Sequence, residues 1–512
     1  MLAAVIKAKN AENVIKYVQK AKNADLIEVR VDYIRNLNEE DIKKIIKSCE
    51  KPSIITNRKK DEGGFFKGNE DERIGILESA INLGVDYIDI EYSSNKNTIK
   101  NLIKKKNKTK IIVSHHNFKK TPDNIVNIYN NIKQLNPDLI KIVTNANSVT
   151  DNFKIFNLIK TANKEKRKII AFCMGSYGEF SRVLSIILGS KITYASIEKG
   201  KESATGQLTI NEMANFYRIK KVNRNTKIVG LIGNPVKHSW SHIIHNAAFD
   251  KLNINAVYLK FRVDKLKEFI DYFKKLNICG FSVTIPHKIE IMGYLDKTDK
   301  KVKEIGAVNT IVVKSDRSKV SRKFKNKKFL SNKNLIGYNT DCEGAVQALK
   351  AKTKLKNKNV VLLGAGGSAR ALAYGLKEED AKIIILNRTV EKAKSLVNRF
   401  DCNYGSLNDL KNIDYDILVN TTSVGMYPDV NNFLISPNLI KRGSIVFDIV
   451  FNPFKTQLLQ DAERKGCAII AGFEMLINGA LLQFKLWTGK NAPEHLMRKK
   501  VLDYLENASY KN

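Results

Sequence analysis

One lysine stands in the middle of an otherwise apolar, β-type run, the stretch DLIKIVTN at 138–145. A permanent charge is costly to bury in a strand, so Lys141 needs a specific explanation. In one interpretation its aliphatic stem lies along the strand while the ammonium reaches solvent. In the other, burial favours the neutral amine, which can attack a carbonyl and form an imine. Lys141 is therefore a candidate nucleophile, and its neighbours must decide between the two interpretations.

Imine chemistry needs a group that moves protons, and two histidines, His115 and His116, end the preceding β-type run. If the two runs are adjacent parallel strands, their ends lie close together and an acid–base partner is within reach of Lys141. Glu91, at the end of an earlier run, is placed to orient a histidine. Three arginines are candidates for holding a substrate carboxylate or hydroxyls, with ion pairs as the alternative: Arg30, Arg58 and Arg182.

The elements that must position these residues are eight β-type runs before about residue 210, at spacings of roughly 25 residues. Helical periodicity fills most of the gaps, as in TPDNIVNIYNNIKQL at 121–135. Eight β–α units are the number that closes a parallel barrel, whose active site lies at the carboxyl ends of the strands. We therefore expect an N-terminal (β/α)8 barrel whose polar strand ends meet at one mouth.

The same segment resembles type I 3-dehydroquinate dehydratase, since EVRVD, TNR, SHHNFKKTP, IKIV, MGSYGEFSRV and SATGQL occur in that family's order. The resemblance implies that Lys141 forms the Schiff base and that His116 is the general acid–base. It also implies a set of substrate-binding residues: Glu28, Arg30, Arg58, Arg182, Ser203 and Gln207. The family usually has proline where this chain has Thr205, a change that concerns the rigidity of the last loop.

A second group of residues indicates a nucleotide site. The stretch GAGGSA at 364–369 fits GxGxxA between a strand and a helix, a turn whose backbone amides can receive a pyrophosphate. The next strand ends in Asn387, Arg388 and Thr389, with no acidic residue to hold a ribose 2′-hydroxyl. Arg388 therefore favours NADP over NAD; an exposed arginine that merely opens a helix is the alternative. We predict the following cofactor-binding residues: Gly364, Ala365, Gly366, Gly367, Ser368, Ala369, Asn387, Arg388, Thr389, Lys392, Ile449 and Gly472.

The segments GNPVKHSWSHIIHNAAF, GFSVTIPHK, GAVNT, GYNTDCEG, NTTSVGM and GFEMLINGALLQFKLWTG resemble shikimate dehydrogenase over roughly residues 227–500. The resemblance implies that Lys288 donates the proton in carbonyl reduction. A carboxylate can orient an ammonium beside a forming alkoxide, so Asp341 is a sensible partner for it. The residues that the resemblance assigns to substrate binding are Ser239, Ser241, Thr284, Asn309 and Asp341.

Two positions depart from the shikimate dehydrogenase pattern. Phe451 replaces the family tyrosine, which removes a hydroxyl contact, and Gly479 aligns with the usual substrate glutamine. Gln483 lies one helical turn later, and we hypothesise that it reaches the same space. A preference for quinate or NAD is the rival interpretation of these changes.

The two resemblances predict an α/β chain in which the barrel precedes a two-lobed α/β dehydrogenase with a Rossmann-like NADP domain. We place the barrel at 1–218, the substrate-binding domain at 227–341 and the NADP-binding domain at 342–512, with C-terminal helices that return to the substrate domain. The expected partners are 3-dehydroquinate, 3-dehydroshikimate and shikimate. The order of the domains then follows the order of two reactions, dehydration and NADPH-dependent reduction.

Composition narrows the remaining classes. The net charge of +36 allows a basic scaffold that binds nucleic acid, but the lysines are spread along all 512 residues, and we expect no nucleic-acid partner. No apolar run approaches the roughly 18 residues of a membrane helix, and no signal peptide is evident, so we expect a cytoplasmic protein. The scattered cysteines and the spacing of His238, His242 and His245 do not favour a metal site. The sequence leaves open a homodimer and the role of the basic insertion at 314–334.

Overall fold

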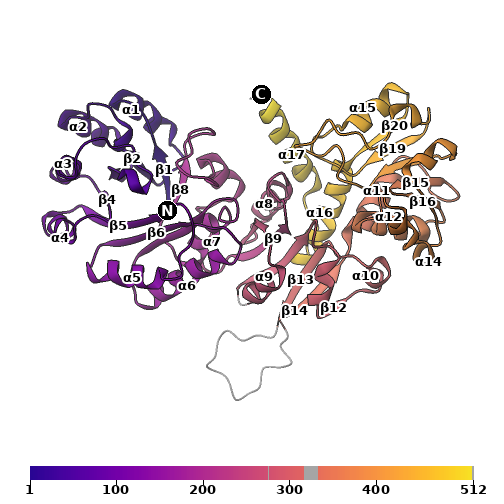
Figure 1. Cartoon of the computed structure of the whole chain (residues 1–512), viewed down its shortest axis with the longest axis horizontal. Coiled ribbons are helices and arrows are strands. Elements are labelled where there is room, and N and C mark those ends of the chain that lie inside the picture. Colours follow the sequence, from indigo (N-terminus) through magenta and orange to yellow (C-terminus); the bar gives the residue numbers. More distant parts are fainter. Residues whose placement is uncertain (275, 316–332, 510–512) are drawn as a thin grey trace, which may run out of the picture. The chain divides into compact units, whose positions relative to one another are not determined.

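The computed structural model describes residues 1–274, 276–315 and 333–509 (Figure 1). The chain divides into two compact units, which are described separately below. Unit 1 comprises Met1–Lys227 and Asn255–Tyr272, and unit 2 comprises Ile228–Ile254 and Phe273–Asn512. Most of the basic insertion at 314–334, namely residues 316–332, lies outside the described residues.

Unit 1 contains an eight-stranded, all-parallel sheet in the order β7-β6-β5-β4-β3-β2-β1-β8, which confirms the predicted barrel architecture (Figure 1). Each strand pairs with the next one in the sequence from β1 to β7, and β8 pairs with β1. The strands are β1 Leu2–Ile6, β2 Leu26–Arg30, β3 Ser53–Thr56, β4 Tyr87–Glu91, β5 Lys110–Asn117, β6 Leu139–Asn145, β7 Ile169–Met174 and β8 Thr193–Ser196. The helices between them are α1 Ala11–Lys20, α2 Glu39–Ser48, α3 Glu70–Asn82, α4 Lys96–Lys105, α5 Ile125–Gln134, α6 Asp151–Lys164 and α7 Ser181–Leu188.

Local sequence explains where these helices begin. Asparagine side chains cap α1 to α4, each accepting a hydrogen bond from a backbone amide of the first turn. The predicted helix at 121–135 is shorter in the structure, since α5 starts at Ile125, three residues after Pro122. Alternate strand residues face the interior, where Ala3, Ile112 and Phe172 belong to one buried cluster. A period of two therefore sends every second side chain, polar or apolar, into the barrel.

Unit 2 contains two sheets. In the first, neighbouring strands follow the order β9-β11-β13-β14-β12, and β13 runs antiparallel to both of its neighbours. Its strands are β9 Lys227–Gly233, β11 Ile278–Val283, β12 Lys297–Thr298, β13 Thr310–Ser315 and β14 Lys333–Tyr338, with helices α8 Ser241–Lys251, α10 Lys300–Ile305 and α11 Thr340–Lys350. β10 (Ala256–Arg262) and nearly all of α9 (Leu266–Phe273) fall within the residues assigned to unit 1.

The second sheet of unit 2 is all-parallel, in the order β17-β16-β15-β18-β19-β20. Numbered from its first strand, this is the 3-2-1-4-5-6 order of dinucleotide-binding folds, and it confirms the Rossmann-like prediction. The strands are β15 Asn359–Leu363, β16 Lys382–Leu386, β17 Asn403–Gly405, β18 Ile417–Asn420, β19 Ile445–Asp448 and β20 Ala468–Ala471. The helices are α12 Gly367–Glu378, α13 Val390–Lys394, α14 Val397–Phe400, α15 Gln457–Arg464, α16 Gly472–Thr488 and α17 Glu494–Ser509.

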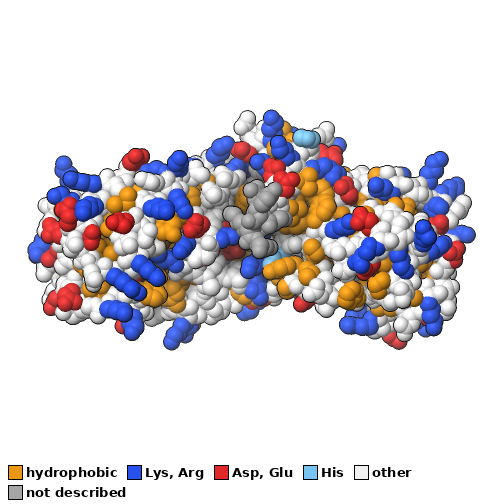
Figure 2. Space-filling model, turned by 90° about the horizontal axis from the view of Figure 1, so that it is seen from above, with side chains coloured by type: hydrophobic (Ala, Val, Ile, Leu, Met, Phe, Trp, Pro, Cys, Tyr) orange, Lys and Arg blue, Asp and Glu red, His pale blue; other side chains and the backbone are white. Residues whose placement is uncertain are grey.

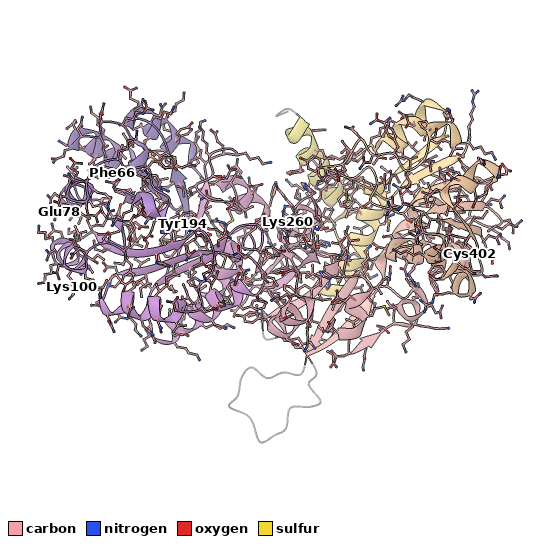
Figure 3. All side chains as sticks on the ribbon, in the orientation of Figure 1. Phe66, Glu78, Lys100, Tyr194, Lys260 and Cys402 are labelled. Carbon is pink, nitrogen blue, oxygen red and sulfur yellow. The ribbon has the colours of Figure 1, made fainter. Side chains whose placement is uncertain are left out.

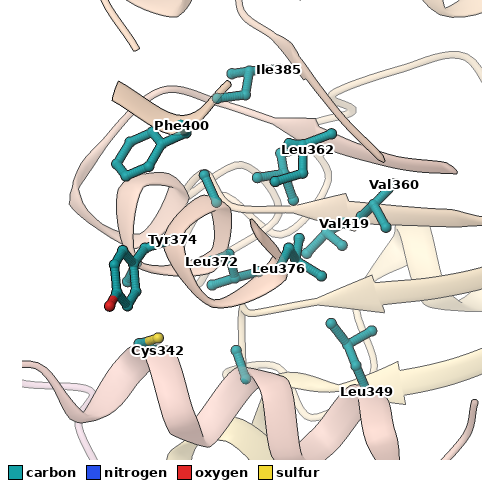
Figure 4. Packing of buried hydrophobic residues seen from close by; sticks show 14 of the residues in the cluster. Cys342, Leu349, Val360, Leu362, Leu372, Tyr374, Leu376, Ile385, Phe400 and Val419 are labelled. Atoms are coloured by element: carbon teal, nitrogen blue, oxygen red, sulfur yellow. The ribbon is translucent and has the colours of Figure 1, made fainter. Parts of the chain in front are cut away.

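A buried apolar cluster fixes α12 on this sheet. Figure 4 shows Leu372 and Leu376 of α12 packed between strand residues such as Leu362 and Val419 and the side chains of α11. The last two helices contact the other sheet's elements, since α17 packs on α8 and α16 on α8, β11 and β13. The two sheets of unit 2 are thus held together through α16 and α17.

Surface charge, helix length and side-chain grouping bear on three other classes of function: nucleic-acid binding, membrane insertion and metal binding. Figure 2 shows Lys and Arg side chains dispersed over the visible face, with acidic and uncharged side chains between them. Among the helices in the described part of the chain, none has the length and apolar character to cross a membrane. Within the same residues, no group of three or more His, Cys, Asp or Glu side chains has a metal-binding arrangement.

Candidate active sites

Lys141 lies inside the barrel, with only 3% of its surface exposed. Its ammonium donates to Oδ2 of Asp89 at 2.8 Å and to Oε1 of Glu28 at 3.3 Å. β6 carries the lysine, β4 the aspartate and β2 the glutamate, so strands that are distant in sequence supply the three groups. The alternative in which the lysine reaches solvent is therefore wrong, because the period of two points this side chain inward among carboxylates.

A buried arginine completes the charge balance around Lys141. The Arg58 guanidinium lies 2.9 Å from Oδ2 of Asp89 and 3.1 Å from Oε1 of Glu91, and it donates to the Ser114 hydroxyl at 2.7 Å. Burial would raise the pKa of Asp89, but the positive charges of Arg58 and Lys141 outweigh it and hold that pKa well below its usual range. Asp89 therefore stays ionised, in close contact with the basic groups of Arg58 and Lys141.

His116 is held by a carboxylate that the sequence analysis did not identify. Oε2 of Glu62 accepts hydrogen bonds from the His116 backbone amide and, at 3.0 Å, faces its ring Nδ1. Burial and the nearby Arg58 lower the pKa of His116, which leaves the ring neutral near pH 7. With Nδ1 directed at Glu62, Nε2 is the nitrogen that can exchange a proton with a substrate.

The prediction that Glu91 orients a histidine is wrong. Both carboxylate oxygens of Glu91 are occupied elsewhere, one by Arg58 and the Lys59 amide and the other by Arg73 at 2.7 Å. Glu91 ends β4, where its side chain meets the arginines that follow β3 and begin α3. It therefore holds Arg58 in place instead of acting on His116.

The other predicted barrel residues are distributed around this centre. Arg30 forms a bidentate pair with Asp32 at 2.8 and 2.7 Å. The Ser203 hydroxyl donates to the side-chain amide oxygen of Gln207 at 3.0 Å. Arg182 is 1% exposed and donates to the backbone oxygens of Gly206 and Tyr194. Burial lowers the pKa of Arg182 to about 10, against the smaller opposing effect of the Glu179 charge.

Three residues of this centre were missed: Asp89, Glu62 and Ser114. Asp89 lies two residues before Glu91 on the same strand, so the strand period could have found it. Ser114 stands two residues before His116 in the same way. Glu62 ends the short 3-10 helix Lys60–Glu62 after β3, outside the strand period that locates the other two residues.

The second centre, in unit 2, is built around Lys288. Its ammonium donates to Oδ2 of Asp341 at 2.6 Å and to the Ser368 hydroxyl at 3.1 Å. Asn309 donates to the other oxygen of Asp341 at 2.7 Å and accepts from the Thr340 backbone amide. The structure therefore brings three predicted substrate-site residues together with Ser368, a predicted cofactor-binding residue in the first turn of α12.

The remaining predicted substrate residues also belong to unit 2. Ser239 donates to the Ser241 hydroxyl at 3.1 Å at the start of α8, and Thr284 follows β11 directly. Gln483 is buried, with its oxygen accepting from Ser282 and its nitrogen donating to Thr310, both at 3.0 Å. Gln483 thus links β11, which carries Ser282, to β13, which carries Thr310.

Gly479 and Phe451, the two departures from the family pattern, both have packing contacts. A Cβ on the facing Gly344 of α11 would lie 3.0 Å from the Gly479 backbone nitrogen, so α11 and α16 pack backbone against backbone. Phe451 packs on Trp240, with 5.1 Å between ring centroids. Gly344 therefore serves close helix packing, whereas a Cβ on Gly479 would lie at an ordinary contact distance of 3.6 Å from the Thr340 carbonyl oxygen. At Phe451, an aromatic contact stands where the family has a tyrosine hydroxyl.

The glycine turn has the shape of a nucleotide site. Gly364 has a φ of 112°, which favours glycine, and a Cβ there would lie 2.7 Å from the Thr421 hydroxyl. Gly366 faces open space, and α12 begins at Gly367 with its first amides available to an anion. A Cβ on Gly472 would lie 2.4 Å from the Ile449 carbonyl oxygen, so these two predicted residues are in close contact.

The 2′-phosphate residues lie at the carboxyl end of β16. The Asn387 side chain donates to the Thr389 carbonyl oxygen at 2.8 Å and orders the turn into α13. Arg388 and Lys392 are exposed and carry positive charge on that turn. The residues present therefore fit a dinucleotide with an additional phosphate.

The fold and the two sites define a class of protein: a barrel lyase with a buried amine, joined to a nicotinamide-dependent reductase. Family models match in the same order. Type I 3-dehydroquinase matches residues 2–224, the shikimate dehydrogenase substrate binding domain 231–311, shikimate / quinate 5-dehydrogenase 346–449, and the shikimate 5′-dehydrogenase C-terminal domain 472–502.

Individual relatives agree with the family models. The chloroplastic bifunctional 3-dehydroquinate dehydratase/shikimate dehydrogenase of Arabidopsis thaliana is 37% identical over 519 residues, covering 97% of this chain and 83% of the relative. A shikimate dehydrogenase (NADP(+)) of Methanococcus maripaludis is 41% identical over 293 residues, covering 55% of this chain and 98% of the relative. A crystal structure of a shikimate dehydrogenase in complex with NADP+ matches with a TM-score of 0.50 and 40% identity, covering 55% of this chain and 97% of that one. The chain belongs to the bifunctional 3-dehydroquinate dehydratase/shikimate dehydrogenase family.

Proposed function

We propose that Lys141 is the reacting amine of the first activity and Lys288 the proton donor of the second. The chain dehydrates 3-dehydroquinate to 3-dehydroshikimate and reduces that ketone to shikimate with NADPH. The observation that carries the first role is the buried Lys141 ammonium between Asp89 and Glu28, in the same unit as the His116–Glu62 pair. These contacts supply a nucleophile and a proton carrier.

The dehydration is written in balanced steps. The Lys141 ammonium loses a proton and its amine attacks the ketone carbon. The carbonyl oxygen takes that proton and a second one from the attacking nitrogen and leaves as water, which gives a protonated imine. His116 then removes a proton from the adjacent carbon, and the C–H electron pair forms a C=C bond while the C=N π pair moves onto nitrogen, which gives an enamine. The enamine pair then expels the β-hydroxyl, which takes the proton from His116 and departs as water. Addition of one water to the imine releases the product and restores Lys141.

The arginines and the last loop bind the substrate in this proposal. Arg182, whose carbonyl partners leave its charge uncompensated, would pair with the substrate carboxylate. Ser203 and Gln207 would contact hydroxyls from the loop after β8. Arg30, Arg58 and Glu28 complete the polar wall.

In the reductase, NADPH supplies a hydride to the ketone carbon when it is bound. Lys288 gives a proton to the ketone oxygen, and Asp341 keeps the ammonium directed at that oxygen. Asn309 fixes Asp341, while Ser239, Ser241, Thr284 and Gln483 are the proposed contacts to the substrate ring. The glycine turn and α12 would hold the pyrophosphate, and Arg388 with Lys392 the 2′-phosphate.

A coupled assay tests both roles. Wild type mixed with 3-dehydroquinate and NADPH should oxidise NADPH, whereas Lys141→Ala should do so only when 3-dehydroshikimate is supplied. Activity of Lys141→Ala with 3-dehydroquinate would remove the lysine from the mechanism. Because both activities share one chain, the reductase also reports that the variant is folded.

Phe451 and Trp240 support a second candidate for the reductase, a preference for quinate. Their ring contact replaces a hydroxyl by apolar surface next to Ser239 and Ser241, and quinate differs from shikimate by added water across the ring double bond. Steady-state assays with shikimate, quinate, NADP and NAD separate the candidates. A higher kcat/KM for quinate would favour the second one.

Three further expectations remain proposals. The domain boundaries 1–218, 227–341 and 342–512 are supported by the change of sheet at each one. The dispersed lysines support small anionic substrates over nucleic acid. Six free cysteines, four of them buried, support a reducing compartment such as the cytoplasm. Homodimer formation is left to a measurement of solution mass.

A further inference from the structure

Tyr194 of β8 is in direct contact with the reacting lysine. The Lys141 ammonium lies 4.2 Å from the centroid of the Tyr194 ring, within the range of a cation–π interaction. The ring is 3% exposed and belongs to the buried barrel cluster (Figure 3). The backbone oxygen of the same residue accepts from Arg182 at 3.4 Å. Tyr194 therefore stands between the group proposed to attack the ketone and the group proposed to bind the carboxylate.

The phenolic hydroxyl of Tyr194 is buried and has no hydrogen-bond partner among the described residues. Ser196, the next inward-facing residue of β8, carries a second hydroxyl in the same condition within that part of the chain. A buried hydroxyl without a partner is unfavourable, and such groups need a specific explanation. By contrast Tyr129, on the outer helix α5, donates to Glu165 at 2.7 Å.

We propose that Tyr194 is a further active-site residue of the dehydratase, whose ring face holds the nitrogen of Lys141 and whose hydroxyl donates a hydrogen bond to the bound substrate. This inference rests on the proposed role of Lys141. The nitrogen is cationic both as the free ammonium and as the protonated imine, so the ring stabilises the charge before and after the covalent step.

The electrostatic surroundings favour a donor. Burial, together with the negative charges of Glu28 and Asp89, raises the pKa of Tyr194 well above its ordinary value. The phenol therefore keeps its proton at neutral pH and can donate it in a hydrogen bond.

Two substitutions separate the hydroxyl from the ring. Tyr194→Phe removes only the hydroxyl, and we expect KM for 3-dehydroquinate to rise about 10-fold with a smaller change in kcat. Tyr194→Leu also removes the ring, and we expect kcat to fall about 10-fold further. Sodium borohydride traps the imine on Lys141, so mass spectrometry should find less adduct in Tyr194→Leu than in wild type. Tyr129→Phe is the matched control, with dehydratase constants equal to wild type.

The outcomes are distinct. Wild-type KM and kcat in Tyr194→Phe would overturn the role of the hydroxyl, and wild-type trapping and kcat in Tyr194→Leu would overturn that of the ring. Reduction of 3-dehydroshikimate by the same preparations reports folding; if Tyr194→Leu fails that check, the isosteric Tyr194→Phe decides. An absence of trapped adduct in wild type would overturn the role of Lys141, and this inference with it.

Discussion

Lys141 and Lys288 are both paired with an aspartate, yet the proposed mechanisms use the two lysines in opposite ways. Lys141 is almost fully buried, touches two carboxylates and an aromatic ring, and has Arg58 competing for Asp89. Lys288 is partly exposed and touches Asp341 and a hydroxyl of the nucleotide turn. Lys141 is therefore held among buried charges for the proposed attack on carbon, whereas Lys288 is held by Asp341 beside the nucleotide turn for the proposed proton donation.

Replacement of Lys141 by arginine gives the sharpest test of this comparison. Lys141→Arg keeps a positive charge but cannot form an imine, so dehydration should fall by about four orders of magnitude or more. The measurement is single-turnover formation of 3-dehydroshikimate, with its reduction by the same sample as the control. Substantial dehydration by the arginine variant would mean that charge, not covalent bonding, is the contribution of this residue.

Loss of Lys288 should be less severe. Lys288→Ala removes a proton donor, and water can replace it in part, so the reductase kcat should fall about 10²- to 10⁴-fold. Dehydration of 3-dehydroquinate by the same protein should be unchanged. A reductase of normal rate would show that another group protonates the forming alkoxide.

The pair of His116 and Glu62 gives a pH test. Glu62 raises the pKa of His116 against the lowering effects of burial and Arg58. Glu62→Gln removes that opposing charge, so the pKa of His116 should fall further and the acidic limb of the kcat/KM profile should move to lower pH. We also expect kcat to fall about 10- to 100-fold, because the ring loses its orienting carboxylate. If the acidic limb of the kcat/KM profile stays at its original pH, the limb does not report the titration of His116.

The cofactor turn gives the smallest effect. Arg388→Ala removes an exposed charge from the proposed 2′-phosphate site, so KM for NADPH should rise about 10-fold while KM for NADH stays constant. Steady-state reduction of 3-dehydroshikimate with each cofactor measures this. Equal changes for both cofactors would indicate a general effect on the turn.

Strand periodicity explains how much of the molecule could be predicted from its sequence. The barrel and the nucleotide sheet follow from runs of buried strand residues, and Lys141, Arg58 and Arg182 were found because each interrupts or follows such a run. Glu62 was missed because it lies in a short 3-10 helix, outside the strand period. Glu91 was given the wrong partner because strand periodicity does not show that Arg58 and Arg73 meet its carboxylate. Gly479 was identified as a departure, and its packing does not explain it, since a Cβ there would meet Thr340 at an ordinary contact distance. The glycine that the close approach of α11 to α16 requires is Gly344, which the sequence analysis did not identify.

Each of the two centres is assembled from residues of a single unit, and one polypeptide carries both. A cell that makes two consecutive enzymes separately can correct an imbalance by changing the amount of either one. Synthesis of this chain always delivers the two centres in equal number. Whether 3-dehydroshikimate accumulates is therefore decided by the ratio of two rate constants, so a substitution in one barrel strand can alter metabolic flux in a way that no change in expression repairs.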